Sequence, residues 1–252
     1  MRLGLLSDIH ANLEALEATL EEGAQIGIEA WVCLGDTVGY GADPSACLEK
    51  VKNNCAVVLL GNHDAAAIGL IDFSFFNPTA RRAAEWTAEQ LSATERHYLA
   101  SLPMVHISDA AHFVHAEPSR PQAWGYITNI WDASEALAAT TADHCFVGHS
   151  HTAFICGLSD GIPRLCTSQI GRVTQREGRR YLTNVGSVGQ PRDGDWRACF
   201  AVWDQEQGAL ELVRCSYDLE RTQKKYATPA YLSFSPRVWP TAGNLYFAAL
   251  YP

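Results

Sequence analysis

The sequence lacks any apolar run long enough to cross a membrane. A spanning helix needs about 20 consecutive apolar residues, and the chain of 252 residues contains no such run. The first six residues lead directly into Asp8, which predicts a first strand rather than a signal peptide. We therefore expect no membrane partner.

Closely paired cysteines are also missing. None of the eight cysteines forms a C-x-x-C pair, and several lie in apolar runs, such as those around Cys33 and Cys145. Buried, reduced thiols explain this distribution better than disulfides or a zinc knuckle do. Together with the absence of a signal peptide, the thiols predict a cytoplasmic protein.

The chain has no excess of basic residues. It carries 28 acidic and 19 basic residues, for a net charge of −9, which disfavours a broad nucleic-acid-binding face and a stable nucleic-acid partner. A small phosphate-bearing substrate is still compatible with this charge, because bound metal ions would reverse the local field. A homo-oligomer is compatible with the sequence as well.

No internal repeat, low-complexity segment or clear linker interrupts the chain. A hydrophobic content of 47% and a charged content of 19% are typical of a globular protein. The simplest interpretation is a single domain over residues 1–252.

Strands and helices alternate in the first 60 residues or so, which predicts an α/β fold with a parallel sheet. Later apolar runs predict strands at 111–114 and 143–147, a helix at 133–139, and a mostly β pattern after residue 151. The expected early elements are strands at 2–6, 30–34 and 56–60, a helix capped by Asn12 and a helix at 44–52. The expected late strands are 154–156, 163–166, 180–184, 198–204 and 210–215.

Three segments differ from this alternation. Residues 65–103 read as helical, with a capping box at Ser92 and Glu95, and we expect them to form a cap-like cover over a site or to pack beside the sheet. Residues 118–131 predict a long loop. Residues 224–252 are rich in proline and predict an irregular tail.

Five short segments place metal-ligand residue types directly after predicted strands. Because α/β sheets bind ligands outside the carboxyl ends of their strands, side chains far apart in the sequence can converge there. Any one segment could be only a capping pair or a turn, but the set in this order predicts a metal site. The five segments are residues 7–10, 35–36, 61–64, 115–116 and 148–151.

The ligand types in these segments indicate transition metals. Asp8 and His10 are separated by one residue, as are His149 and His151, and on an extended chain the two members of each pair would point to the same side. The mixture of nitrogen and oxygen donors favours manganese, iron, zinc, nickel or cobalt over calcium or magnesium alone. The lack of cysteine ligands disfavours a structural zinc site.

The ordered array D-x-H, G-D, G-N-H-D, H and G-H-x-H resembles the calcineurin-like metallophosphoesterase family, over roughly residues 1–205. Residues 181–192 also resemble the loop that follows the histidine pair in small bacterial members. The resemblance implies a four-layer α/β/β/α fold, in which a two-sheet sandwich is flanked by helices. It implies two divalent transition metal ions, manganese first, the first held by Asp8, His10, Asp36 and His151 and the second by Asp36, Asn62, His115 and His149.

The resemblance also implies an enzyme that hydrolyses phosphomonoesters or phosphodiesters by in-line attack of a metal-bridging hydroxide. His63 would donate a proton to the leaving oxygen or stabilise charge, and Asp64 would orient its ring. The expected partner is a small phosphate ester or nucleotide. The expected substrate contacts are Asn12, Tyr40, Asn62 and Arg192, although Tyr40 and Arg192 could equally serve only their loops.

Three alternatives stay open at this point. Trp124, Tyr126 and Trp131 could form a wall that stacks on a nucleobase or aryl group, or could simply pack their loop. A dinucleoside polyphosphate hydrolase would need a groove for two nucleosides. A non-catalytic protein-interaction scaffold on the same fold predicts eroded catalytic positions, yet His63 and all presumed ligands are present.

Overall fold

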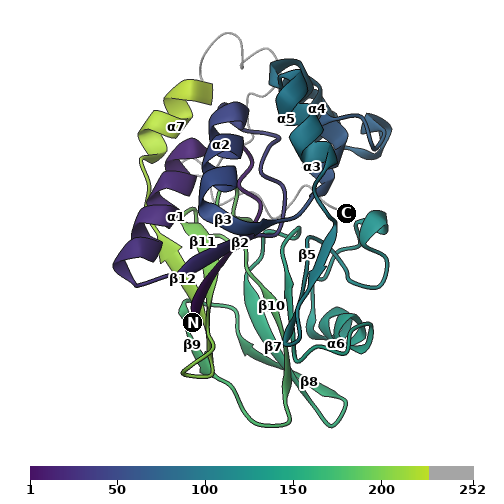
Figure 1. Ribbon diagram of the computed structural model, residues 1–252, viewed down its shortest axis with the longest axis vertical. Helices are drawn as coiled ribbons and strands as arrows, with labels where there is room; N and C mark the ends of the chain where they lie inside the picture. The colour runs from purple at the N-terminus through teal and green to yellow at the C-terminus, as the bar shows by residue number, and fades with distance from the viewer. Residues whose placement is uncertain (227–252) are drawn as a thin grey trace.

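The computed structural model describes residues 1–226, which build two six-stranded sheets packed face to face (Figure 1). The first sheet contains, in order across it, β3 (Cys55–Val58), β2 (Ala30–Cys33), β1 (Arg2–Leu6), β11 (Ala198–Asp204), β12 (Ala209–Cys215) and β9 (Gly171–Thr174). The second contains β4 (Val105–Ile107), β5 (Ala111–Val114), β6 (His144–Val147), β10 (Arg180–Asn184), β7 (Phe154–Ser159) and β8 (Ile162–Thr167).

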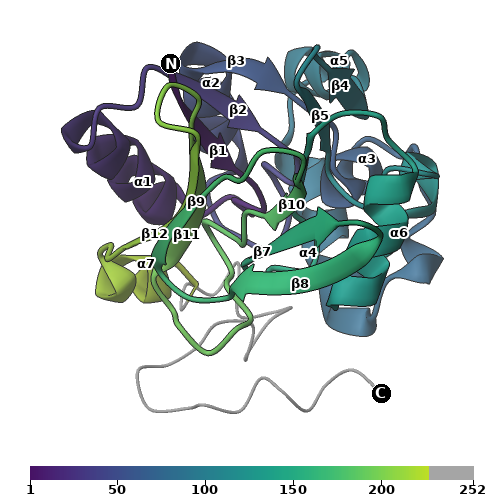
Figure 2. The ribbon, with the colours of Figure 1, turned by 90° about the horizontal axis from the view of Figure 1, so that it is seen from below.

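Helices cover the outer faces of both sheets. They are α1 (Leu13–Gln25), α2 (Pro44–Asn54), α3 (Asn62–Ala67), α4 (Pro78–Gln90), α5 (Ala93–Ala100), α6 (Ile130–Ala138) and α7 (Leu219–Tyr226), with 3-10 turns at Phe73–Phe75 and Pro121–Ala123. Helices α1 and α2 pack on the first sheet, α7 lies beside α1, and α6 packs on the second sheet (Figure 2). The predicted α/β/β/α sandwich is confirmed.

Both sheets are mixed, and the parallel pairing expected from the early alternation is present in β1, β2 and β3. Strands β1, β2 and β3 pair in parallel, as do β5, β6 and β10, whereas β11, β12 and β9 and the pairs β4–β5, β10–β7 and β7–β8 are antiparallel. The cause lies in the connections. Short turns can join only antiparallel neighbours, while parallel strands need long crossovers such as the one through α1.

A hydrophobic core between the sheets fixes their spacing. It includes Leu5 of β1, Phe146 of β6 and Tyr181 of β10, each with at most 1% of its surface exposed. Burying such side chains contributes roughly 1.5–3 kcal/mol each. The carboxyl ends of the parallel strands meet at one end of the sandwich. There, Oδ1 of Asp8, after β1, lies 3.9 Å from Nε2 of His115, after β5.

The segment over residues 65–103 is helical, as predicted, and lies at this end of the sandwich. Figure 1 shows α3, α4 and α5 gathered together there. Asn77 caps α4 through hydrogen bonds that its side chain accepts from the next turn, and Ser92 and Glu95 form the expected capping box of α5. Residues of this segment, such as Phe76 and Ala80, line the cavity described below.

Several local expectations need correction. Strands β4 and β9 and helices α3 and α7 were not predicted, because they are short or lack a clear period. Residues 224–226 belong to α7 and are not part of an irregular tail, while the rest of that predicted tail, 227–252, lies outside the described residues. The predicted loop at 118–131 contains a 3-10 turn, and α6 begins within it, at Ile130.

Two predictions about composition can be compared with the structure. All eight cysteines are free thiols, and Cys33 and Cys145 are buried as expected. Burial raises the pKa of each of these two thiols to about 12. Among residues 1–226, no helix has the length and apolarity needed to span a membrane.

Candidate metal centre

The chain turns sharply as it leaves the strands that carry the predicted ligands. Asp8, His10, Asp36, His149 and His151 all have φ between 49° and 65°, in the left-handed region. The extended chain expected for the two D-x-H and H-x-H pairs is therefore wrong. Left-handed backbone costs on the order of 1 kcal/mol for each such residue, although Asp and His tolerate it better than β-branched residues do.

Backbone hydrogen bonds between neighbouring segments hold these turns. Asp8 donates its N–H to the carbonyl of Gly35 at 3.0 Å, and His10 donates to the carbonyl of Asp36 at 3.0 Å. The carbonyl of Asp8 accepts from the N–H of Gly189 at 3.0 Å and from the hydroxyl of Ser187 at 2.7 Å. The loop after β10 thus supports the ligand segment after β1.

Glycine is required where two of these segments approach most closely. A Cβ added at Gly61 would lie 2.1 Å from Oδ1 of Asp36, and one added at Gly148 would lie 2.2 Å from Oγ of Ser7. Contacts this short do not occur between real side chains. Gly61, before Asn62, and Gly148, before His149, therefore allow the ligand segments to converge.

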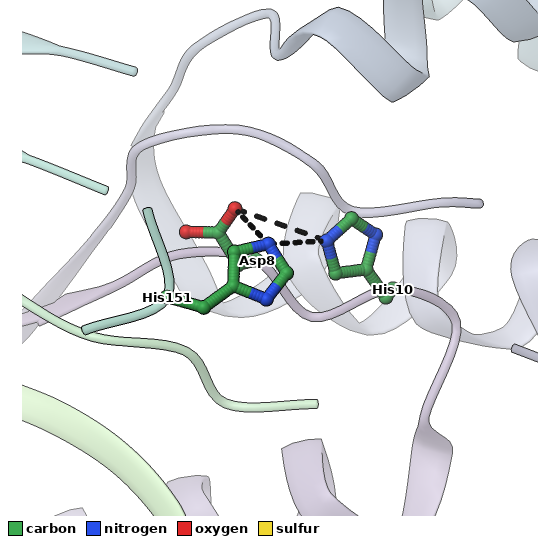
Figure 3. A group of neighbouring side chains, drawn as sticks. All are labelled: Asp8, His10 and His151. Carbon is green, nitrogen blue, oxygen red and sulfur yellow. Dashed lines mark hydrogen bonds and ion pairs between the residues drawn. The ribbon is translucent and has the colours of Figure 1, made fainter. Parts of the chain in front are cut away.

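The first group of candidate ligands consists of Asp8, His10 and His151 (Figure 3). Oδ1 of Asp8 lies 3.2 Å from Nε2 of His151 and 3.8 Å from Nε2 of His10, and the two imidazole nitrogens are 3.1 Å apart. All three side chains are at most 2% exposed. Three donor atoms thus converge on one buried point.

The second group consists of Asp36, His115 and His149. Nε2 of His115 lies 3.4 Å from Oδ2 of Asp36 and 3.2 Å from the amide oxygen of Asn62. The structure therefore brings together the four residues expected for the second ion. Asp36 also lies near the first group, with Oδ2 at 3.7 Å from Nε2 of His10, as a carboxylate shared between two ions would.

Backbone carbonyls define which ring nitrogens of His10 and His151 face inward. Nδ1 of His10 lies 3.2 Å from the carbonyl of Val38, and Nδ1 of His151 lies 2.6 Å from the carbonyl of Gln190. Because a carbonyl only accepts, each Nδ1 carries the proton, which leaves the facing Nε2 atoms with lone pairs. Two lone pairs at 3.1 Å repel each other unless a cation lies between them.

His149 is oriented in the same way but with the opposite nitrogen. Its Nε2 donates to the carbonyl of Trp124 at 2.9 Å, so Nδ1 is the nitrogen left for a ligand bond. Trp124 adopts the left-handed conformation, with φ 53°. The loop at 121–126 is thereby tied to the centre through its backbone.

Two buried carboxylate oxygens without hydrogen bonds also make this cluster suitable for binding cations. Oδ1 of Asp8 and Oδ2 of Asp36 accept no hydrogen bond within the described part of the chain. Burial by itself would raise the pKa of both carboxyls, yet the surrounding histidines lower it below the ordinary value. Burial likewise opposes the charge on His115, but Asp36 and Asp8 outweigh it and raise the pKa of that ring to about 9. The cluster thus attracts positive charge, as a divalent-metal site must.

A cavity of about 560 Å³ opens onto these groups. Its polar end contains Asp36, Asn62, His149 and His151, and Arg192 also lines it. A cavity of this size accommodates a small organic molecule.

His63 lies at the edge of both groups and also lines the cavity. One of its ring nitrogens lies within 4.8 Å of ligand atoms of His10 and Asp36, and its ring packs on Tyr40 with centroids 4.6 Å apart. Burial lowers the pKa of His63 to about 4. The expected contact with Asp64 is not formed.

Asp64 instead supports the backbone. Its two oxygens accept from the N–H groups of Val38, at 3.0 Å, and Gly61, at 3.1 Å. Burial and the nearby Asp36 raise the pKa of Asp64 to about 7. Asp64 therefore stabilises the loop after β2 and the start of α3. Helix α3 begins at Asn62, so the Asp64 side chain in its first turn reaches back to the N-terminus of the helix.

The four predicted substrate contacts divide into two sets. Tyr40, Asn62 and Arg192 line the cavity. Asn12 does not: it is 1% exposed, caps α1 by accepting from the N–H of Ala15 at 3.2 Å, and donates to the carbonyl of Gly189 at 3.1 Å. Its capping role, also visible in the sequence, explains its position.

The aromatic wall considered for residues 118–131 is partly present. Trp124 and Tyr126 line the cavity, whereas Trp131 lies in the first turn of α6 and is 67% exposed. Sequence reasoning missed Ile71 and Phe76, which also line the cavity. It also missed the backbone carbonyls that orient the histidine rings, because a carbonyl is present in every residue type.

Comparison with known proteins places this centre in a family. Residues 1–208 match the calcineurin-like phosphoesterase superfamily domain. The uncharacterized protein MJ0912 of Methanocaldococcus jannaschii is 34% identical over 232 residues, which cover 88% of this chain and 90% of that protein.

Two solved structures are similar over nearly their whole length. The metallophosphoesterase of Sphaerobacter thermophilus is 36% identical with a TM-score of 0.78, over 90% of this chain and 93% of that one. The hypothetical protein PH1004 of Pyrococcus horikoshii shares the fold at 20% identity, with a TM-score of 0.73 over 94% and 95% of the two chains. From its sequence, its fold and its candidate metal ligands, this chain belongs to the calcineurin-like phosphoesterase superfamily.

Proposed function

We propose that this protein is a phosphoesterase with a dinuclear metal centre that hydrolyses phosphomonoesters or phosphodiesters. The observation that carries the proposal is the pair of buried ligand groups, sharing Asp36 and opening onto one cavity. Family membership supports hydrolysis of phosphate esters. The free, buried thiols fit a reducing compartment, and we place the protein in the cytoplasm.

The mixture of imidazole and oxygen donors supports a transition metal. Manganese is our first choice on the family resemblance, with iron, zinc, nickel and cobalt as alternatives. When bound, such ions neutralise phosphoryl charge and make water a stronger nucleophile. One ion would be held by Asp8, His10, Asp36 and His151, and the other by Asp36, Asn62, His115 and His149.

The remaining cavity residues position the substrate in this scheme. Arg192 offers a guanidinium that can pair with a phosphoryl oxygen, and Gln190 holds it through a hydrogen bond of 2.8 Å to its side-chain oxygen. His63 lines the cavity next to both ligand groups, where a ring N–H can donate a hydrogen bond to the leaving oxygen and stabilise its charge. Tyr40 supports the ring of His63 from one side.

The two alternative functions receive less support. A non-catalytic scaffold has no need for converging buried ligands whose outer nitrogens are oriented by carbonyls. A dinucleoside polyphosphate hydrolase must neutralise several phosphates. Among the described residues that line the cavity, Arg192 is the single arginine and no lysine is present.

The test is an activity panel with the protein loaded in turn with each of the five metals. The substrates are an aryl phosphomonoester, an aryl phosphodiester, cyclic nucleotides and dinucleoside polyphosphates. We expect Asp36→Asn to lose metal and turnover together, and His63→Ala to lose turnover while it retains metal. His97→Ala, on the exposed face of α5, is the matched control. If no metal supports turnover of any ester, or if Asp36→Asn remains as active as the wild type, the proposal is wrong.

A further inference from the structure

We infer that the site selects phosphate esters whose ester group carries a planar aromatic ring, and that Tyr126 and Phe76 are its specificity-determining residues. This inference rests on the proposed function and identifies the substrate class of the same cavity. Metal binding does not require the aromatic rings found at this site: His149 and His63 each pack against a ring from a loop.

Tyr126 forms one of these pairs. Its ring stacks on the imidazole of His149, with centroids 4.1 Å apart and planes inclined by 17°, yet it is 52% exposed and lines the cavity. The hydrogen bond from His149 to the carbonyl of Trp124 fixes the start of this loop at the same imidazole. Tyr126 is therefore positioned as a flat platform beside the reacting phosphate.

Phe76 forms the second pair. Its ring lies 4.7 Å from that of His63, inclined by 35°, and it lines the cavity together with Ile71 and Ala80. These residues belong to the segment over residues 65–103, and Phe76 gives the cavity an apolar surface next to His63. An ester group attached to a phosphate at the ligands would extend between apolar walls.

The charges of the cavity fit a compact ligand of this kind. Arg192 is the single arginine or lysine among the described lining residues, enough for one phosphate beside the metal ions. Flat apolar surfaces favour rings over sugars or alkyl chains, since aromatic pairs gain energy beyond the area that they bury. An aryl group and a nucleobase both satisfy this chemistry.

Phosphonates test the inference by binding alone, because their P–C bond resists hydrolysis. Calorimetry on the manganese-loaded full chain would compare methyl-, cyclohexyl- and phenylphosphonate, with an acyclic adenine phosphonate as the nucleobase arm. We expect phenylphosphonate to bind about tenfold more tightly than methylphosphonate, with cyclohexylphosphonate between them. If phenylphosphonate binds more tightly than the adenine phosphonate, the site prefers aryl esters; the reverse order indicates a nucleobase.

Three variants distinguish binding of the aromatic ring from binding of the phosphate. Tyr126→Leu should reduce the preference for phenylphosphonate to about twofold, and Tyr126→Phe should keep it. Phe76→Leu should weaken the same preference, because it removes the aromatic ring beside His63. Methylphosphonate affinity and manganese content report whether the metal ligands are intact in each variant.

The inference is overturned if phenyl- and methylphosphonate bind equally, if neither binds, or if Tyr126→Leu keeps the full preference. Ring selectivity in binding without turnover of any ester would instead contradict the proposed function and leave the inference standing. The two failures are therefore distinguishable.

Discussion

Replacing Gly61 by alanine should disrupt the metal centre with little change elsewhere. Gly61 has φ −96°, a conformation that any residue adopts, so the backbone itself tolerates the substitution. The new Cβ would lie 2.1 Å from Oδ1 and 2.3 Å from the N atom of Asp36, where ordinary contact begins near 3.4 Å. Either Asp36 or the start of α3 must therefore move by about 1 Å.

The carboxylate of Asp36 cannot move freely, because its Oδ1 accepts from the N–H of His63 at 2.8 Å. Crowding of this kind costs about 1–3 kcal/mol of unfolding free energy. A ligand misplaced by about 1 Å is expected to lower turnover roughly 100-fold. Manganese affinity from calorimetry and turnover of an aryl phosphodiester measure the two effects at the site, and urea denaturation measures stability.

Gly69→Ala is the matched control. Gly69 follows α3, has φ +79° and has no atom within 4 Å of an added Cβ, so alanine there costs about 1 kcal/mol of backbone strain without touching the site. We expect it to lose stability but to keep manganese affinity and turnover. Wild-type metal binding in Gly61→Ala, or equal losses of metal binding in the two variants, would refute the reasoning.

Two further predictions concern residues away from the ligands. Arg214 pairs with Asp193 in a largely buried contact that anchors the loop carrying the carbonyl bonded to His151. Arg214→Met should lower the unfolding free energy by about 3 kcal/mol in urea denaturation and weaken manganese binding about tenfold. Adding Asp193→Asn should restore part of the stability and part of the metal affinity. Equal losses in the single and double variants would contradict this prediction. Burial lowers the pKa of His144 from 6.5 to about 4, so the unfolded chain takes up a proton on this ring at a higher pH than the folded protein does. The contribution of neutral His144 to folding stability is therefore complete above pH 6.5 and is lost as the pH falls toward 4. His144→Phe should remove about 3 kcal/mol of that acid-dependent loss, and an unchanged stability–pH profile would argue against it.

The placement of the ligands could be predicted from the sequence because it depends on topology. Ligand types follow the apolar strands directly, and strands joined by crossover helices present their carboxyl ends at one edge. Asp8 and His115, more than 100 residues apart in the chain, accordingly lie 3.9 Å from each other. The apolar periods also predicted the strands and helices around them.

The local geometry of the ligands could not be predicted in the same way. The D-x-H spacing predicted an extended chain, whereas His10 and His149 have φ values of 49° and 65°. Their conformation depends on hydrogen bonds to segments distant in the sequence. The carbonyls of Val38 and Trp124 orient these rings, and a carbonyl leaves no trace in the residue type.

The roles of two polar residues depended on contacts that the motif does not reveal. Asp64 follows His63 in the chain, but the first turn of α3 directs its carboxylate to the N–H groups of Val38 and Gly61. Asn12 was expected near the substrate, yet its side chain is used by the cap of α1. Adjacency in a motif therefore did not predict which group each side chain would contact.

Anomalous diffraction from manganese-grown crystals tests the central claim most directly. We predict two anomalous peaks, one among Asp8, His10 and His151 and one among Asp36, His115 and His149, with the Asp36 carboxylate bonded to both. A protein that showed a single peak, or none within these two groups, would contradict a dinuclear centre at this site.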